Sequence, residues 1–525
     1  MPPSVKLTAD ELDRALAFIE GRSASFAFPQ PLEFAAIRAS WGDKVRPALE
    51  AAELLSRDPN PCLRTTAPKQ RALIRSVHLL DPIDTILYTG LVFRLAPAIE
   101  SRRVTYQAGR VCSYHFDAGA DPEQTLTSDW DAHRARLAAP CDKYAYVGTT
   151  DIVDFFPRIY LHRLQNGLEA VTGDKPGVAA LMRMVEGWSA GTSYGIPTGP
   201  HASNFLAEAL LIEVDEYLLS CDVEFVRWVD DYFIFGDSEQ EVVAGTFRLG
   251  ERLDQTQGLS LNSAKTHLQK TDSYSENILH RVDPAEEWRQ SIVDGILDGM
   301  SWYDDMVGID QLTDEQLEAI NDVDARVMLE EALEGDLVDL KTVRLILSFL
   351  ATFQRPELAD LVIDNLPRLS PLSEGVARFL DALADVEDAD HPSIGERIIG
   401  YLASGTFVPE FQAMWLLDPF TKSANWNNLI FLRKTARDAH SLLVRRQAIL
   451  GLLQSQDRSA ILDAKSSLDD ARDWERRAIL FACAGLPKDE RDAVVSQAGG
   501  AGGQWDVRNR LEKAVLAYVK AGNSL

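Results

Sequence analysis

Apolar and polar positions follow different patterns in the two halves of the chain. Up to about residue 275, helix-like stretches alternate with short runs of aromatic and β-branched residues that are typical of strands, with Pro and Gly punctuation such as GIPTGP at 195–200. From about residue 310 the pattern is uninterrupted amphipathic helix. The sequence therefore predicts an α+β half followed by an all-α half.

Several helix starts are marked by local signals. Thr8 with Glu11, and Thr313 with Gln316, have the spacing of capping boxes, in which the first side chain and the residue three positions later satisfy each other's backbone donors. Pro200 is placed to begin a helix whose apolar positions recur at helical spacing in HASNFLAEALL. We expect helices to begin at all three points.

Short apolar helix cores recur in the second half, as LSFLA, LDALA, MWLLD, LGLLQ and LFACA, which begin at residues 347, 380, 414, 450 and 480. The steps between them match the length of one helix pair, which is typical of a helical-repeat array of the HEAT type. The alternative is an irregular helical bundle, because the copies are degenerate. A Gly-rich patch, QAGGAGG at 497–503, is interpreted as a loop, because no strand precedes it.

The composition is that of a globular protein long enough for two to four domains, with 525 residues, 46% hydrophobic and 25% charged. No apolar run approaches the length of a membrane span, and the N-terminal residues have the pattern of a capped helix, so we expect a cytoplasmic protein without membrane contact. The five cysteines are scattered and form no C-x-x-C pair, which argues against both a disulfide framework and a zinc site.

The formal net charge is −27. Non-specific binding of nucleic acid depends on clustered Lys and Arg, so the charge argues against a protein that coats nucleic acid non-specifically, and any such contact must be local. The acidic surface of the second half is interpreted as a solvated face.

Two aspartates lie side by side in FVRWVDDYFIFG, residues 225–236, within a run that is otherwise mostly aromatic and β-branched. The flanks predict two strands joined at a tight turn that carries Asp230 and Asp231. Two carboxylates 4 Å apart repel by roughly 4 kcal/mol at an effective dielectric constant of about 20. Either the turn is merely solvated, since Asp favours turns, or bound cations neutralise the pair.

A third carboxylate favours the second interpretation, in which bound cations neutralise the pair. Asp151 lies in TTDIVDFFPRIY, residues 149–160, directly after the strand-like YAYVGTT. Three carboxylates from two segments suit Mg²⁺, which prefers oxygen ligands and keeps water or phosphate in its other positions. Two such ions can hold the attacking and departing oxygens of a phosphoryl transfer. The three aspartates are therefore candidate metal ligands.

Four motifs then occur in order: TDIVDFF, GIPTGP, RWVDDYFIF and LSLNSAKT. Together they resemble the successive palm motifs of reverse transcriptases over roughly residues 60–275. The resemblance implies a fingers and palm fold and an RNA-directed DNA polymerase. It also implies that Asp151, Asp230 and Asp231, with the backbone carbonyl of Ile152, bind two Mg²⁺ ions, for which Mn²⁺ can substitute.

The same resemblance assigns further residues. Phe156 matches the aromatic gate that excludes a ribose 2′-hydroxyl, although taken alone it would be a core ring. Gly199 permits close approach of the backbone to the nucleotide or template. Thr198 stands where relatives often have glutamine, and Trp228 where they more often have Tyr or Phe beside the primer end. Lys265 matches a lysine that protonates pyrophosphate, against the plainer interpretation of a surface lysine.

Three basic residues upstream, Lys69, Arg71 and Arg75, have even spacing and would share one face of a strand. Such a face would suit the triphosphate, and the following LLDPIDTILYTGLVFRLAPAIE resembles the fingers segment of the family. Three solvated charges on an edge strand are the alternative.

The expected organisation is fingers and palm at 1–275, a connector at 276–310 and an α-helical, HEAT-like repeat domain at 311–525. A palm joined to helical repeats resembles bacterial abortive-infection and other defence-associated reverse transcriptases. That resemblance implies antiphage defence and a homo-oligomer. It also implies that dNTPs are joined without a template and that synthesis is primed on the protein, which leaves the DNA product attached to it. Two alternatives stay open: an RNA-templated enzyme with a partner non-coding RNA, and a palm-shaped scaffold without turnover.

Overall fold

The computed structural model describes residues 3–70, 73–103, 106, 108–279, 284–297, 311–426, 428–471, 473–500 and 507–522. Backbone contacts divide the chain into two compact units. The first comprises Met1–Phe26, Trp41–Leu63 and His78–Arg281, and the second comprises Ala27–Ser40, Arg64–Val77 and Val282–Leu525. No described helix is both long and apolar enough to cross a bilayer.

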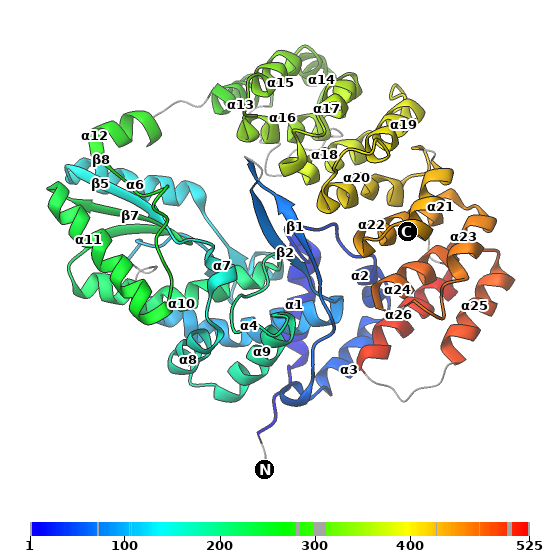
Figure 1. Ribbon diagram of the computed structural model, residues 1–525, viewed down its shortest axis with the longest axis horizontal. Helices are drawn as coiled ribbons and strands as arrows, with labels where there is room; N and C mark the ends of the chain where they lie inside the picture. The colour runs from blue at the N-terminus through cyan, green and yellow to red at the C-terminus, as the bar shows by residue number, and fades with distance from the viewer. Residues whose placement is uncertain are drawn as a thin grey trace. The chain divides into compact units, whose positions relative to one another are not determined.

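The first unit contains a four-stranded antiparallel sheet in the order β6-β7-β5-β8 (Figure 1). Its strands are β5 (Tyr146–Asp151), β6 (Glu224–Trp228), β7 (Asp231–Gly236) and β8 (His267–Lys270). A small separate sheet pairs β3 (His115–Phe116) with β4 (Leu126–Thr127). The helices of this unit are α1 (Ala9–Arg22), α3 (Arg46–Glu50), α4 (Pro82–Arg102), α6 (Trp130–Lys143), α7 (Phe155–Arg158), α8 (Leu161–Thr172), α9 (Lys175–Trp188), α10 (His201–Ser220), α11 (Glu239–Arg252) and α12 (Thr271–Tyr274).

The two faces of the sheet pack against different helices, because successive side chains of a strand alternate between faces. Leu137 and Cys141 of α6 share a buried cluster with Val147 of β5 and Phe235 of β7. On the other face α11 approaches so closely that a Cβ on Gly148 would lie 2.6 Å from the side chain of Val242. We call the side that packs against α6 the α6 face.

The predicted helix starts are confirmed. Thr8 and Glu11 form a complete capping box at the start of α1, and Thr313 and Gln316 form another at the start of α14. Pro200 directly precedes α10, as expected for a residue whose fixed φ suits a helix entry.

The second unit is mainly helical. Its helices are α2 (Glu33–Ala39), α13 (Pro284–Gly295), α14 (Asp314–Asn321), α15 (Ala325–Leu333), α16 (Leu340–Thr352), α17 (Ala359–Asp364), α18 (Ser373–Ala382), α19 (His391–Leu402), α20 (Glu410–Lys422), α21 (Leu429–Asp438), α22 (Leu442–Ser455), α23 (Arg458–Lys465), α24 (Asp473–Ala482), α25 (Lys488–Gly500) and α26 (Val507–Ala521). The hairpin of β1 (Leu63–Pro68) and β2 (Ile74–Leu79) contributes most of its residues to this unit.

Alternate helices of this unit stack in chain order, from α16 through α18, α20, α22 and α24 to α26, as Figure 1 shows. Each of the five recurring apolar segments found in the sequence lies wholly or partly in one of the first five of these helices. The helical character of this half is therefore as predicted, and its assignment to the HEAT type stays a prediction. The Gly-rich patch at 497–503 continues α25 as far as Gly500, where a loop was expected, and the rest of it lies outside the described residues.

Two segments from the first 80 residues belong to the helical unit, which the sequence pattern does not reveal. Glu33 of α2 is buried and contacts Arg446 of α22 at 2.6 Å and Arg477 of α24 at 3.0 Å. From the β1–β2 hairpin, the hydroxyl of Thr65 donates to Glu410 at 2.7 Å. The expected connector, 276–310, includes α13, and its residues 280–283 and 298–310 lie outside the described chain.

Candidate active site

The hairpin predicted around the two aspartates is present. β6 and β7 pair up to Trp228 and Asp231, which face each other directly, so the turn consists of Val229 and Asp230. Val229 has a φ of 53°, a left-handed conformation that is unfavourable for a β-branched residue. The turn must therefore be held in place by its surroundings.

Two buried side chains hold this strained residue. The backbone N–H of Val229 donates to the hydroxyl of Ser113 at 3.0 Å, and Arg227 donates to the carbonyl of Val229 at 2.7 Å. Both polar groups of the residue before Asp230 are thereby fixed. Hydrogen bonds with buried side chains, and not the turn sequence alone, therefore fix the backbone conformation of the turn that carries the two aspartates.

Asp151 lies directly across the sheet from Asp231, because β5 and β7 pair in that register. Residues opposite each other in an antiparallel pair have Cβ atoms about 5 Å apart. The backbone N–H of Ile152 also donates to the carbonyl of Asp230 at 3.2 Å. Residues about eighty positions apart in the sequence therefore meet at one edge of the sheet.

The electrostatics of this edge indicate crowded negative charge. Burial and the neighbouring Asp230 carboxylate raise the pKa of Asp231 to about 6, with a further contribution from Asp151 and opposition from Lys265. Asp151 is 6% exposed, and its Oδ1 atom has no hydrogen-bond partner among the described residues. A cation bound at this edge would offset the repulsion between the carboxylates and would give Oδ1 of Asp151 a partner.

Lys265 provides positive charge at this edge. Its Nζ donates to Oδ2 of Asp151 at 2.5 Å, and this hydrogen bond is the main reason why the pKa of Lys265 is raised. A turn presents the lysine, since Asn262 donates from its backbone to the carbonyl of Asp151 at 2.8 Å and accepts from the backbone of Lys265 at 3.1 Å. The lysine predicted from LSLNSAKT thus lies beside the first aspartate.

The donor set suits a divalent cation in its chemistry. Three carboxylates, one with an unpartnered buried oxygen and one with a raised pKa, are hard oxygen ligands of the kind that Mg²⁺ prefers. Among the described residues, no three or more His, Cys, Asp or Glu side chains are gathered tightly enough to hold a metal ion as they stand. In this arrangement Asp151 pairs with Lys265 instead.

A buried ionic network lies under the turn and was not predicted from the sequence. Arg227 is 1% exposed and donates to Glu208 at 2.9 Å and to Asp215 at 2.6 Å. Glu208 also contacts Arg103 at 3.1 Å and accepts from Ser113 at 2.6 Å. Although burial alone would lower it, the carboxylates of Asp215 and Glu208 raise the pKa of Arg227 well above its ordinary value. In the sequence, the signal for this network was Arg227 itself, a charged residue within the apolar run FVRWV.

The other residues matched to nucleotide contacts lie in two places. Phe156 is half-buried in α7, stacks edge-on against Phe155 at a centroid distance of 5.7 Å, and accepts from the backbone of Ile196 at 3.2 Å. Thr198 is buried, and its hydroxyl has no partner among the described residues. Gly199 has a φ of 133°, and a Cβ there would lie 2.7 Å from the carbonyl of His78, so the close approach at this glycine is to the protein's own backbone.

The three basic residues do not share one strand. Lys69 follows β1 in the turn of the hairpin, Arg75 lies in β2, and Arg71 is outside the described residues. Lys69 and Arg75 are both exposed. Even spacing predicted a common face only for an uninterrupted strand, and a turn falls between these positions.

Four rings form a cluster beside the hairpin, which we call the aromatic cluster: Trp130, His133, Trp228 and Phe233. Trp130 and Trp228 meet edge to face at a centroid distance of 5.0 Å, and His133 lies 5.2 Å from Trp228 and 5.4 Å from Phe233. Sequence reasoning had identified only Trp228. For Trp130 and His133, the available signal was their Trp-x-x-His spacing, which places both on one side of α6.

We expect His133 to make the stability of the first unit depend on pH. Burial lowers the pKa of His133 to about 4, against 6.5 for an unperturbed histidine. Below pH 6.5 the unfolded chain takes up a proton that the folded chain does not, so stability falls as the pH drops towards 4, by about 2 kcal/mol at pH 5. We expect His133→Phe to lose less stability between pH 7 and pH 5 than the unsubstituted protein in urea unfolding. Equal losses would contradict a buried neutral imidazole.

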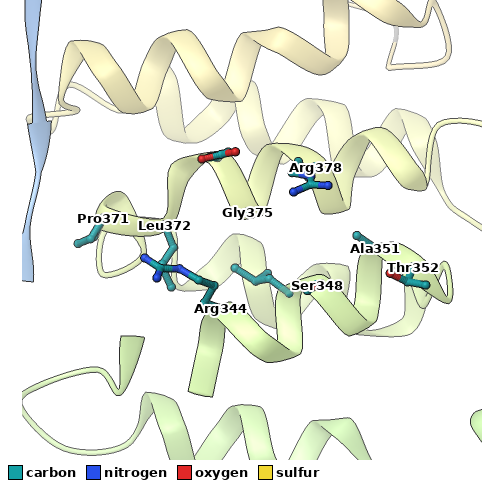
Figure 2. Close-up of a pocket in the computed structure, with 10 residues that line it drawn as sticks. Arg344, Ser348, Ala351, Thr352, Pro371, Leu372, Gly375 and Arg378 are labelled. Carbon is teal, nitrogen blue, oxygen red and sulfur yellow. The ribbon is translucent and has the colours of Figure 1, made fainter. Parts of the chain in front are cut away.

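The helical unit contains a hollow of about 300 Å³ between α16 and α18, shown in Figure 2. Arg344 and Arg378 lie on either side of it, with Glu374 and Gly375 on α18. None of the catalytic, substrate-binding or metal-binding residues predicted from the sequence lines it.

Comparison with known families finds a match to part of the first unit. Residues 86–281 match the family model described as "Reverse transcriptase (RNA-dependent DNA polymerase)". This part of the chain is a reverse transcriptase domain. The match supports RNA-directed DNA polymerase activity, and polymerases of this family generally use divalent metal ions such as Mg²⁺.

Structural comparison adds two similar chains. Telomerase from Candida albicans, in complex with a TWJ fragment of telomeric RNA, has 11% identity and a TM-score of 0.32 over 76% of this chain and 70% of its own. Apo telomerase from Candida tropicalis has 11% identity and a TM-score of 0.33 over 69% of each chain. None of the curated proteins matches this chain. Likenesses this weak carry no argument about substrates, so the reverse transcriptase domain rests on the family match.

Proposed function

We propose that this protein is a DNA polymerase that joins deoxynucleotides by two-metal nucleotidyl transfer. The observation that supports this most is the pairing of Asp151 with Asp231 across the sheet, beside Asp230 in the strained turn. The pairing brings three carboxylates to one edge of a sheet that lies within the matched domain. A scaffold that had lost turnover would have no need to hold this repulsive arrangement against burial.

Each residue then has a defined role. The aspartates would hold Mg²⁺ or Mn²⁺, which when bound would supply positive charge to the attacking and departing oxygens. Asp151 and Asp231 offer oxygen ligands from neighbouring strands and Asp230 offers one from the turn, with the backbone carbonyl of Ile152 as a further ligand. Lys265 is kept protonated by its raised pKa and donates a proton to the departing pyrophosphate.

Phe156 is proposed to select deoxynucleotides. Its ring is half-buried and braced by Phe155, so it cannot easily move aside for a 2′-hydroxyl. We expect Phe156→Ala to incorporate ribonucleotides at least about tenfold better relative to deoxynucleotides, which corresponds to about 1.4 kcal/mol of lost discrimination. The measurement is the ratio of kcat/KM for rCTP and dCTP. Phe155→Leu removes the bracing ring but keeps Phe156, so it should relax the ratio by less than Phe156→Ala does. An unchanged ratio in Phe156→Ala contradicts the assignment.

The biological role that we propose is antiphage defence by abortive infection, with synthesis that is primed on the protein and needs no template, in a homo-oligomer. The net charge of −27 supports a mode of synthesis that does not depend on a broad basic groove for a duplex. The stacked helices of the second unit support the defence-associated type, because that type joins a palm to helical repeats. The family description favours a second candidate, an RNA-templated enzyme with a partner non-coding RNA.

One experiment separates these modes. Purified, nuclease-treated protein is incubated with α-labelled dNTPs and Mg²⁺, denatured and then digested with protease. We expect label that stays with the denatured protein, is released by protease, and is absent in Asp230→Asn. Label that appears only when RNA is retained supports the templated alternative. Absence of label in all conditions, or equal label in Asp230→Asn, contradicts the polymerase proposal.

A further inference from the structure

Trp130 is the outermost ring of the aromatic cluster and is 53% exposed. A tryptophan with this much exposed surface is unusual, because its large apolar area is normally buried. Its position is nonetheless fixed, since it contacts Trp228 at a centroid distance of 5.0 Å and His133 at 5.1 Å. The chain thus holds a rigid, solvent-facing indole.

The exposed ring lies on the same face of the sheet as the aspartates. Trp228 faces Asp231 directly across the hairpin, and Asp231 faces Asp151 across the next strand pair. Directly paired residues project to the same face, so all three side chains lie on the α6 face. Trp130 at the start of α6 packs against Trp228 and therefore adjoins the carboxylate edge.

The aromatic cluster contributes packing contacts, not positive charge. His133 is fully buried, and neither of its ring nitrogens has a hydrogen-bond partner among the described residues. Burial lowers the pKa of His133 to about 4, so near neutral pH the imidazole is an uncharged packing surface between Trp228 and Phe233. It holds the indoles without adding positive charge.

The N-cap and first turn of α6, on either side of Trp130, carry negative charge. Asp129 caps α6 by accepting from the N–H of Ala132, and Asp131 adds a second carboxylate in the first turn. These carboxylates repel a phosphate group at this helix terminus. A flat, polarisable ligand suits the exposed indole ring.

We propose that Trp130, backed by Trp228, stacks on the nucleobase at the 3′ end of the growing DNA strand. This inference rests on the proposed polymerase function, because the aspartates fix where the attacking 3′-hydroxyl must lie, and the base of the same nucleotide lies nearby. Base stacking on aromatic rings tolerates every sequence. It would give an acidic protein affinity for its product without clustered Lys and Arg.

The test uses a short single-stranded oligodeoxynucleotide with 2-aminopurine at its 3′ end, whose fluorescence is quenched by stacking. Binding is measured in Asp230→Asn protein without dNTPs, so the readout does not require catalysis. We expect quenching on binding, affinity weakened about tenfold and quenching lost in Trp130→Ala, and both largely kept in Trp130→Phe. A 2-aminopurine at the 5′ end should respond equally in all variants.

Phe247→Ala provides a matched control, because Phe247 is another exposed aromatic residue, at 69%, on α11, which packs on the opposite face of the sheet. It should bind like the unsubstituted protein. Unchanged quenching and affinity in Trp130→Ala, or failure of the unsubstituted protein to quench the 3′ probe, overturns the proposal. Failure of the polymerase function is a separate result, seen as incorporation of label that does not depend on Asp230.

Discussion

Asp151→Asn should abolish Mg²⁺-dependent incorporation of deoxynucleotides, with kcat reduced by about a thousandfold or more. The substitution keeps the size of the side chain but removes the charge that faces Asp231 across the sheet. Stabilisation by a metal ion contributes several kcal/mol to a transition state, and each 1.4 kcal/mol corresponds to about a tenfold change in rate. Initial rates with labelled dNTP, measured at saturating Mg²⁺, provide the test.

Asp154→Asn is the matched control for this prediction. Asp154 lies three residues later in the same segment, is exposed, and has a left-handed φ of 47°, which Asn tolerates well. Its activity should stay within about twofold of the unsubstituted protein, since surface substitutions away from special features have little effect. Equal losses in both variants would show that negative charge in this segment matters in general and that Asp151 has no special role.

Arg227→Met should destabilise the reverse transcriptase domain by about 3–5 kcal/mol, because it leaves the carboxylates of Glu208 and Asp215 buried without their partner. It also removes the donor to the carbonyl of Val229, so the turn that carries Asp230 loses one of its two anchors. We therefore expect activity to fall even under conditions in which the variant is still folded. Hydrogen exchange of the β6 and β7 amides measures the loss of stability within this unit.

Two further variants separate the effect of burial from that of charge. Arg110→Met removes an arginine that contacts the same hairpin through Glu224 of β6. This pair is partly exposed, and we expect a cost of about 1 kcal/mol or less. Arg227→Lys keeps the charge but cannot reproduce the forked contacts with Asp215 and should recover only part of the stability. If Arg110→Met and Arg227→Met destabilise the domain equally, the network does not position the turn.

Local signals in the sequence predicted local structure well. The capping boxes at Thr8 and Thr313, the Asp230 hairpin and the apolar cores of the stacked helices all depend on residues within a few positions of one another. The convergence of Asp151 on the hairpin could be predicted because both segments are strands that end in carboxylates. For the candidate site, the sequence therefore identified the charged residues at its centre.

The remaining features depend on contacts between distant residues. Glu33 belongs to the helical unit because Arg446 and Arg477, more than four hundred positions later, contact it. Trp130 contacts the hairpin only because α6 packs on the sheet. The even spacing of Lys69 and Arg75 does not place them on one strand face, because a turn separates the two positions. Periodicity describes one element at a time and does not specify which elements meet.

Binding of Mn²⁺, followed by the loss of its free-ion electron paramagnetic resonance signal, examines the proposed metal centre without requiring catalysis. In the presence of dNTP, the unsubstituted protein and Asp154→Asn should bind Mn²⁺ saturably, and Asp151→Asn and Asp231→Asn should bind at least about tenfold more weakly, because each has lost one charged oxygen ligand. Identical Mn²⁺ binding by all four proteins would contradict a metal centre formed by these aspartates.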